Sequence, residues 1–272
     1  MEIYFISALQ SLGYTEREAA FLFLVATHSG YFLRRQFNYF CNRQKGFIAQ
    51  RFLEKAQRAK HITTIDCGQR FFLYHLFSKP LYRVLGHPDS QNRRRKGDGS
   101  IRARLMALDY VLENPEEYYL ASEDDRVNFF SVARKLCADR MVMGKAFWGT
   151  PLVSIVDRMH PATTLVRFIF IDEGLQSMSR FCRFLSTMKP ILEAMGSFEL
   201  IYTACSTHNF QPAEKEFRRH FEVRTTLKQG ALLPGLERET GKHSPSCHAQ
   251  FTTLLFHYSY PRLRREDQWG SV

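Results

Sequence analysis

The chain has 272 residues, more than the roughly 100 to 200 of a usual single domain, so two domains are the first expectation. With 44% apolar and 24% charged residues, the composition excludes a collagen-like, repeat-only or largely disordered protein. The formal net charge is +11, and residues 1–100 contribute +9 of it, with 16 Lys and Arg against 7 Asp and Glu. Such a basic region favours a polyanionic partner, because each neutralised phosphate releases counterions, although solvated charge without a partner is the alternative.

Cysteine spacing and hydropathy indicate the cellular compartment. The six cysteines include no Cys-x-x-Cys pair, which favours reduced thiols over a disulfide framework. The longest apolar run, Ala19 to Ala26, is far shorter than the ~20 residues of a membrane span, and no secretory signal is evident at the start. We therefore expect a cytoplasmic protein with no membrane partner. His243, Cys247 and His248 lack the further cysteines of a zinc set, so neither a metal nor a cofactor is expected.

Residues 1–86 are predicted to begin with three helices. Thr15, followed three positions later by a glutamate, forms a capping box that starts a helix running to about residue 28. The aromatic spacing of residues 31–40 predicts a second, shorter helix. In residues 47–59, Ile48, Phe52 and Ala56 recur at intervals of four, which predicts a third helix that buries these three side chains.

A β-hairpin is predicted next, from the β-branched and aromatic runs 62–65 and 70–76 around a Gly-containing turn. Three helices and a hairpin are the element order of a winged helix-turn-helix, whose third helix enters the major groove while the hairpin lies over the neighbouring backbone. Gln50 and Arg51 are the best candidates to contact base edges, and Lys60 and Arg70 to contact phosphates. The alternative is that this fold serves protein contacts or dimerisation. The residues expected to bind DNA are Arg43, Gln44, Lys45, Gln50, Arg51, Lys55, Lys60 and Arg70.

The remainder is predicted to form a linker, a second domain and a tail. Residues 87–100 contain the run Arg93–Lys96 and no apolar residue beyond a proline, which predicts a solvated basic linker, with phosphate contact by these cations equally open. Residues 101–230 open with a helix at 101–112 and then alternate strand-like and helix-like segments, which predicts an α/β domain with a mixed sheet. Residues 231–272 are predicted to be a loop-rich tail. The expected strands of the second domain are 118–121, 152–157, 165–171 and 198–204, and its further helices include 122–136 and 175–185.

The segments TEREAAFLFLVATHSGYFLRRQF, FLYHLFSKPLYRVLG and IRARLMALDYVL resemble the replication-relaxation proteins of bacterial plasmids and integrative elements. The resemblance implies a winged helix followed by an α/β domain related to restriction endonucleases. That domain carries a Pro-Asp, a strand reading Glu-x-Asp-Arg-Gly-Thr and a helix with Lys. Here Asp157 stands where the Pro-Asp is expected, without the proline, and FIDEG (170–174) stands where the strand is expected. Phe170 occupies the acidic position and Lys189 only loosely matches the lysine, so the resemblance implies a degenerate nuclease-like domain.

A metal-dependent nuclease needs two or three carboxylates to hold Mg²⁺, and Asp157, Asp172 and Glu173 are the candidates at strand ends. Because Phe170 supplies no oxygen ligand, the leading hypothesis is a non-enzymatic protein that binds double-stranded DNA in the replication, transfer or regulation of a mobile element. Its α/β domain would then assemble as a homodimer or with another mobile-element protein. A nuclease using Asp157 and Asp172 is one alternative, and a ligand-sensing transcriptional regulator is another.

Overall fold

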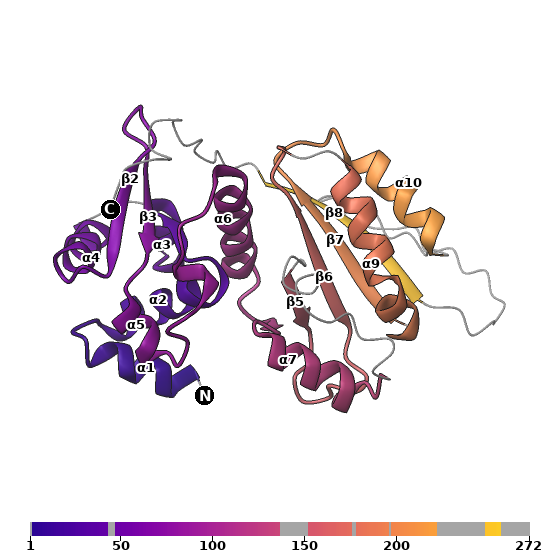
Figure 1. Ribbon diagram of the computed structural model, residues 1–272, viewed down its shortest axis with the longest axis horizontal. Coiled ribbons are helices and arrows are strands. Elements are labelled where there is room, and N and C mark those ends of the chain that lie inside the picture. The colour runs from indigo at the N-terminus through magenta and orange to yellow at the C-terminus, as the bar shows by residue number, and fades with distance from the viewer. Residues whose placement is uncertain are drawn as a thin grey trace. The chain divides into compact units, whose positions relative to one another are not determined.

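The computed structural model describes residues 2–42, 47–136, 152–175, 178–195, 197–221 and 248–256. The protein is mixed α+β (Figure 1), and its contacts divide it into two compact units. The described residues up to Pro115 form the first unit, and the described residues from Glu116 onwards form the second. No helix within the described ranges is long and apolar enough to cross a membrane.

The first unit opens on helices and closes on a long helix. The capping box predicted at Thr15 is confirmed: Thr15 Oγ1 accepts a hydrogen bond from the Glu18 amide at 3.3 Å, and Glu18 Oε2 accepts one from the Thr15 amide at 2.8 Å. In chain order its described elements are α1 (Glu2–Gln10), α2 (Glu16–His28), β1 (Tyr31–Leu33), α3 (Arg34–Phe40), α4 (Phe47–Arg58), β2 (Ile62–Asp66), β3 (Phe72–Leu76), α5 (Lys79–Val84), the 3-10 turn η1 (Gln91–Arg93) and α6 (Asp98–Glu113).

Strands β1, β3 and β2 form an antiparallel sheet in that order. The prediction of a helix over all of residues 31–40 is wrong in its first turn, because residues 31–33 pair with β3, more than 30 residues away in the sequence. The two faces of this sheet are both covered. Phe32 and Tyr74 belong to the core built with α2 and α4, whereas Tyr31 and Leu33 belong to a second cluster with Leu105 of α6.

Helix α6 belongs to the first unit, although the sequence predicts that it opens the second domain. Leu108 and Leu112 are buried in the core of the first unit. Asp109, also buried, accepts two hydrogen bonds of 2.7 Å from the Arg35 guanidinium on α3. The division between the units therefore falls after Pro115 instead of near residue 100, because the inward face of α6 is apolar and matches the sheet.

The second unit contains a five-stranded sheet in the order β4-β5-β6-β7-β8. The pairs β4/β5 and β5/β6 are antiparallel, and the pairs β6/β7 and β7/β8 are parallel, so the predicted mixed sheet is confirmed. Strand β8 lies in the region predicted to be a loop-rich tail. The described elements are β4 (Tyr118–Tyr119), α7 (Glu123–Asn128), the π-helical turn η2 (Phe129–Ala133), β5 (Leu152–Ile155), β6 (Val166–Asp172), α9 (Ser179–Met195), β7 (Ser197–Ala204), α10 (Phe210–His220) and β8 (His248–Leu255).

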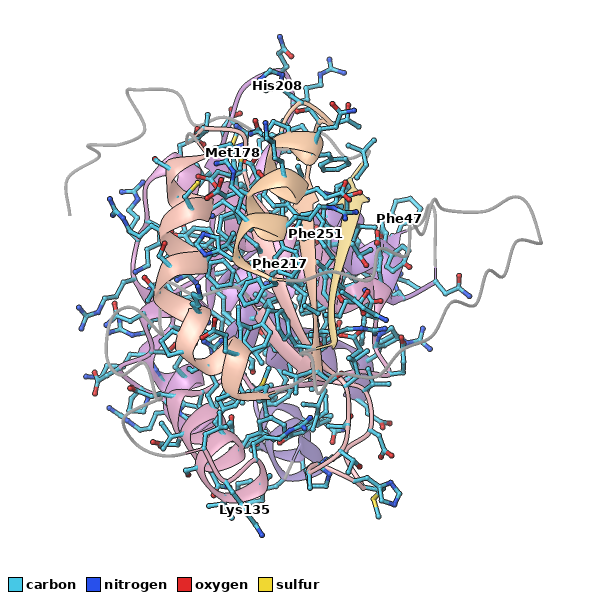
Figure 2. All side chains as sticks on the ribbon, turned by 90° about the vertical axis from the view of Figure 1, so that its right-hand side faces the viewer. Phe47, Lys135, Met178, His208, Phe217 and Phe251 are labelled. Carbon is cyan, nitrogen blue, oxygen red and sulfur yellow. The ribbon has the colours of Figure 1, made fainter. Side chains whose placement is uncertain are left out.

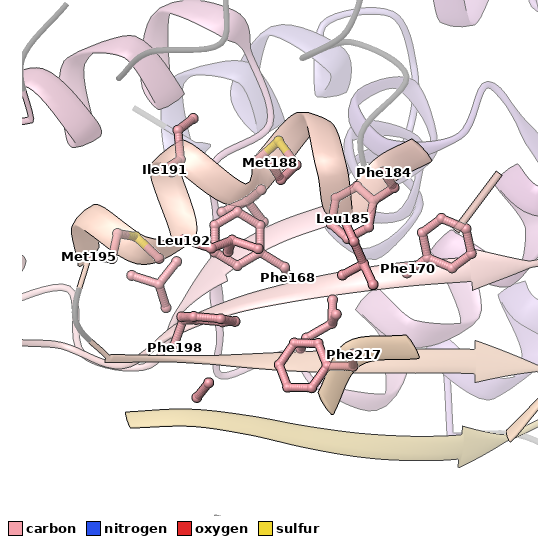
Figure 3. Packing of buried hydrophobic residues seen from close by; sticks show 14 of the residues in the cluster. Phe168, Phe170, Phe184, Leu185, Met188, Ile191, Leu192, Met195, Phe198 and Phe217 are labelled. Atoms are coloured by element: carbon pink, nitrogen blue, oxygen red, sulfur yellow. The ribbon is translucent and has the colours of Figure 1, made fainter. Parts of the chain in front are cut away.

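Helices α9 and α10 cover one face of this sheet (Figure 1). Figure 3 shows Leu185 and Met188 of α9 packed over Phe168 and Phe198 of the sheet. The ring of Phe217 on α10 lies 5.0 Å from that of Phe251 on β8 (Figure 2). Alternate side chains of each strand enter this core, so the intervening residues point to the opposite face of the sheet.

Candidate nucleic-acid interface

Helix α4 has a packed apolar face and an exposed face, and the exposed face carries polar side chains together with Phe47 and Ile48. Its rotation is set by Phe52, whose ring stacks on Phe37 of α3 at 4.2 Å and contacts Phe21 of α2. With Phe52 fixed inward, Ile48 is 45% exposed, so the predicted burial of Ile48 is wrong, whereas that of Phe52 and Ala56 is confirmed. The buried side chains of α4 are Ala49, Phe52, Leu53 and Ala56, and the exposed ones are Phe47, Ile48, Gln50, Arg51, Glu54, Gln57 and Arg58.

Gln50 and Arg51 both lie on the exposed face of α4, as expected of groups that contact base edges. Gln50 Nε2 donates a 2.9 Å hydrogen bond to Glu54 Oε1, one turn further along the helix. Arg51 forms no ion pair with any described residue, so its guanidinium is available to a ligand. Glu54 adds a negative charge to this face, which opposes phosphate binding but suits the exocyclic amine of cytosine.

Lys55 has an intramolecular role. Its Nζ lies 2.6 Å from Glu18 Oε2 and 3.1 Å from the Gly13 carbonyl oxygen, and it lies over the ring of Tyr14 at 5.6 Å. Glu18 is largely buried in the capping box of α2. Lys55 therefore neutralises a carboxylate of the core and ties α4 to α2, a role that differs from the predicted contact with DNA.

Lys60 and Arg70 both follow α4 in the chain and are both exposed. Lys60 follows the end of the helix with φ 54°, and Arg70 lies with φ 61° in the turn that joins β2 to β3. That turn is closed by a 2.9 Å hydrogen bond from the Cys67 amide to the Phe71 carbonyl and by Asp66 Oδ1, which accepts from the Gly68 amide at 2.8 Å. These hydrogen bonds fix the backbone of the turn that carries Arg70, and the Lys60 amide donates a 2.9 Å hydrogen bond to the Gln57 carbonyl oxygen. Arg43, Gln44 and Lys45 lie outside the described residues.

Asp157 follows β5 and takes part in a local turn. Its carboxylate accepts hydrogen bonds from the Met159 amide at 2.8 Å and pairs with His160 Nδ1 at 2.6 Å. The hydrogen bond with His160 and that from the Met159 amide lower the pKa of Asp157. This geometry stabilises a turn.

Asp172 ends β6 and is buried at the carboxyl end of the parallel strands. Its Oδ2 accepts hydrogen bonds from the Tyr202 hydroxyl at 2.6 Å and the Asn209 amide at 2.9 Å, and its Oδ1 accepts from the Gly174 amide at 2.9 Å. Burial raises the pKa of the Tyr202 hydroxyl, and the hydrogen bond to Asp172 raises it further. Phe170, on the same strand, packs in the core against Phe181 and Phe184.

The strand register keeps Asp157 and Asp172 apart. Ile155 pairs with Val166, the first residue of β6, and Asp157 continues beyond that end, whereas Asp172 is the last residue of β6. At about 3.3 Å per residue the two carboxylates lie roughly 20 Å apart. They therefore cannot bind one metal ion, contrary to the nuclease alternative drawn from the sequence.

The second unit contains two buried sets of ion pairs that cannot be predicted from the sequence. Glu173, with a side chain 1% exposed, pairs with Arg180 at 2.7 Å. On the sheet face opposite α9, Arg167 bridges the buried carboxylates of Glu117 and Glu199, at 2.8 Å from Glu199 Oε2. Because their partners lie on different strands or beyond a turn, no local spacing could reveal either group.

Among the residues that the structure describes, no cluster of three or more His, Cys, Asp and Glu side chains is placed to hold a metal ion. Comparisons of the chain with protein-family models, with curated proteins and with solved structures found no match.

Proposed function

We propose that the first unit is a winged helix that binds double-stranded DNA, with α4 in the major groove and the β2–β3 hairpin over the adjacent backbone. The observation that carries the proposal is the exposed face of α4, where Arg51 and Arg58 project from a helix whose other face is firmly packed. Lys60 follows the end of α4, and Arg70 lies in the turn between β2 and β3. Polar side chains on the exposed face of a helix, together with cations on the hairpin, supply base contacts and phosphate contacts.

In this proposal Arg51 and Gln50 contact base edges, and Lys60 and Arg70 contact phosphates. Lys55 acts indirectly, by holding α4 against α2 through Glu18. The resemblance of the sequence to replication-relaxation proteins supports a role in the replication, transfer or regulation of a mobile element in the cytoplasm.

A pair of substitutions on α4 tests this placement. Arg51→Met is expected to weaken binding to a preferred duplex by about 1–3 kcal/mol, because it removes a base contact, without altering thermal stability. Lys55→Met removes the same charge from the same helix but should lower the melting temperature while changing DNA affinity little, since Glu18 loses its partner. Affinity is measured by fluorescence anisotropy of the full chain, and stability by thermal melting. Unchanged affinity in Arg51→Met would place α4 outside the groove, and an equal loss of affinity in Lys55→Met would mean that Lys55 contacts DNA directly.

Wild-type binding should also weaken steeply as salt rises from 50 to 200 mM, because phosphate contacts release counterions. This dependence is measured in the same anisotropy titrations. An affinity that does not change with salt concentration over this range would contradict a DNA-binding role.

We further propose that the second unit is not catalytic and assembles with a second copy or with another mobile-element protein. Asp157 and Asp172 support this reading, since both are engaged in local hydrogen bonds and lie at opposite ends of β6. The full chain is expected to leave supercoiled and linear DNA intact in the presence of Mg²⁺, as followed on agarose gels. Metal-dependent nicking that Asp172→Asn abolishes in a folded protein would establish the nuclease instead.

A further inference from the structure

Residues 91–97, predicted to be a solvated linker, are held against the first unit. Asn92 Nδ2 donates hydrogen bonds to the Ala26 and Thr27 carbonyl oxygens at 2.9 and 2.8 Å, and its Oδ1 accepts one from Arg104 of α6. The Tyr31 hydroxyl accepts a 2.9 Å hydrogen bond from the Lys96 amide. The backbone of this segment is therefore fixed at both ends of its basic run, which fixes the positions from which its cations extend.

The segment and the start of α6 concentrate positive charge. Between residues 93 and 104 there are six Lys and Arg and one acidic residue, Asp98. Arg94 is exposed and Lys96 is partly exposed, and neither forms an ion pair with a residue that the structure describes, whereas Arg104 donates hydrogen bonds to the Ser29 carbonyl oxygen and to Asn92. Burial lowers the pKa of Lys96, and the neighbouring charges of Arg104 and Arg94 lower it further. Arg102 Nε is buried without a hydrogen-bond partner. Bound anions would relieve this repulsion.

This cationic surface and the exposed face of α4 lie on opposite sides of the three-stranded sheet. Tyr31 stacks on His75 at 4.2 Å, and its hydroxyl contacts the basic segment. The next residues along the two strands, Phe32 and Tyr74, enter the core that α4 covers. Because side chains alternate across a strand, a straight duplex lying along α4 does not reach the basic segment.

We propose that Arg94, Lys96 and the start of α6 form a second phosphate-binding surface that holds a second DNA duplex, so that one molecule bridges two duplexes. This inference rests on the proposed function for the first duplex. Phosphate groups are the anions expected, because arginine and lysine bind them through charge-assisted hydrogen bonds. Residues 87–104 expose no large apolar side chain among those described, which favours nucleic acid over a membrane surface. The contacts are to the backbone and are therefore independent of sequence.

A capture assay tests the bridge with the full chain. One duplex is immobilised, protein is added, and retention of a second, fluorescent duplex of unrelated sequence is measured. Wild type should retain the second duplex, and Arg94→Ser combined with Lys96→Ser should reduce retention at least tenfold while binding the immobilised duplex as wild type does. As a control, Lys79→Ser combined with Arg83→Ser removes the same amount of charge from α5. This variant should still retain the second duplex. Arg94→Lys with Lys96→Arg should restore retention, which separates charge from folding.

The possible results distinguish this inference from the proposed function. Retention that persists in the Arg94 and Lys96 variant means that bridging arises elsewhere, for instance through a dimer, and overturns the inference, as does failure of wild type to retain any second duplex. Binding to phosphatidylglycerol vesicles that requires Arg94 and Lys96, without capture of DNA, overturns it in favour of a membrane. If Arg51→Met leaves binding to the immobilised duplex unchanged while the Arg94 and Lys96 variant loses capture, the placement of α4 fails and the second surface stands.

Discussion

Replacement of Arg167 by methionine is expected to lower the free energy of unfolding of the second unit by about 3–5 kcal/mol, the usual result of removing one partner from a buried ion pair. Arg167 is 21% exposed and joins Glu117 and Glu199, whose side chains are almost fully buried. Burial by itself lowers the pKa of Arg167, but the hydrogen bonds and charges of Glu199 and Glu117 outweigh this effect and raise the pKa overall. Ser154 and Thr252 donate further hydrogen bonds to these carboxylates, at 2.5 and 2.7 Å. Hydrogen exchange of the β6 and β7 amides measures the loss.

Two further variants isolate the ionic contribution. Adding Glu117→Gln and Glu199→Gln to Arg167→Met should recover much of the stability, because no unpaired buried charge remains. Arg183→Met, on the exposed side of α9, removes an equal charge and should change stability by no more than about 0.5 kcal/mol. A loss below about 1 kcal/mol in Arg167→Met would show that the two carboxylates do not depend on this arginine.

Replacement of Gly30 by alanine is expected to destabilise the first unit by about 2–5 kcal/mol. Gly30 has φ +78°, and a Cβ there would lie 2.0 Å from the Asn92 carbonyl oxygen. The turn η1 would have to move away, and Asn92 would lose its hydrogen bonds to the end of α2. Urea unfolding, followed by the hydrogen exchange of α2 and β1, measures the effect.

Gly86→Ala provides the matched control. Gly86 has nearly the same backbone conformation, with φ +77°, but a Cβ there meets nothing within 4 Å. It should cost only the conformational penalty of a left-handed residue, about 1–2 kcal/mol. Equal losses in the two variants would mean that the contact between Gly30 and η1 contributes nothing.

Two helices of the first unit, α2 and α4, are predicted from local determinants, whereas α1 and α5 are not predicted. The capping box of Thr15 and Glu18 starts α2, and the spacing of apolar residues marks α4. Strand β1 is not predicted because three residues are too few to show the alternation of apolar and polar side chains typical of a strand. Its pairing with β3 depends on residues 73–75, which are distant in the sequence. The rotation of α4 about its axis depends on the stacking of Phe52 on Phe37 of α3. The spacing of apolar residues within α4 alone therefore predicts the burial of Ile48 wrongly.

Assignment to a domain is a non-local property as well. Helix α6 has an apolar face that would suit either unit, and the pairing of Arg35 with Asp109, 74 residues later, is not visible in the spacing. The basic run of residues 93–96 is equally compatible with a solvated linker and with a folded segment until the contacts of Asn92 are known.

For the candidate site residues too, the sequence predicts local properties and misses those that depend on distant contacts. Gln50, Arg51, Lys60 and Arg70, which are expected to contact DNA, are exposed, because polar residues on an amphipathic helix and in a hairpin turn face solvent. The pairing of Lys55 with Glu18 depends on how α4 meets α2, and the separation of Asp157 from Asp172 depends on strand register. Neither relation follows from composition or spacing.

The parallel pairing of β7 with β8 bears on how the protein folds during synthesis. The strands pair over eight residues, from Ser197 with His248 to Ala204 with Leu255. Strand β8 is therefore synthesised more than 40 residues after the end of β7. Until the ribosome has released residues 248–255, β7 is an edge strand with unpaired backbone groups and buried-type side chains such as Leu200 and Ile201. A nascent chain stalled in this interval is prone to self-association, and chaperones that cover exposed strands would act at that stage.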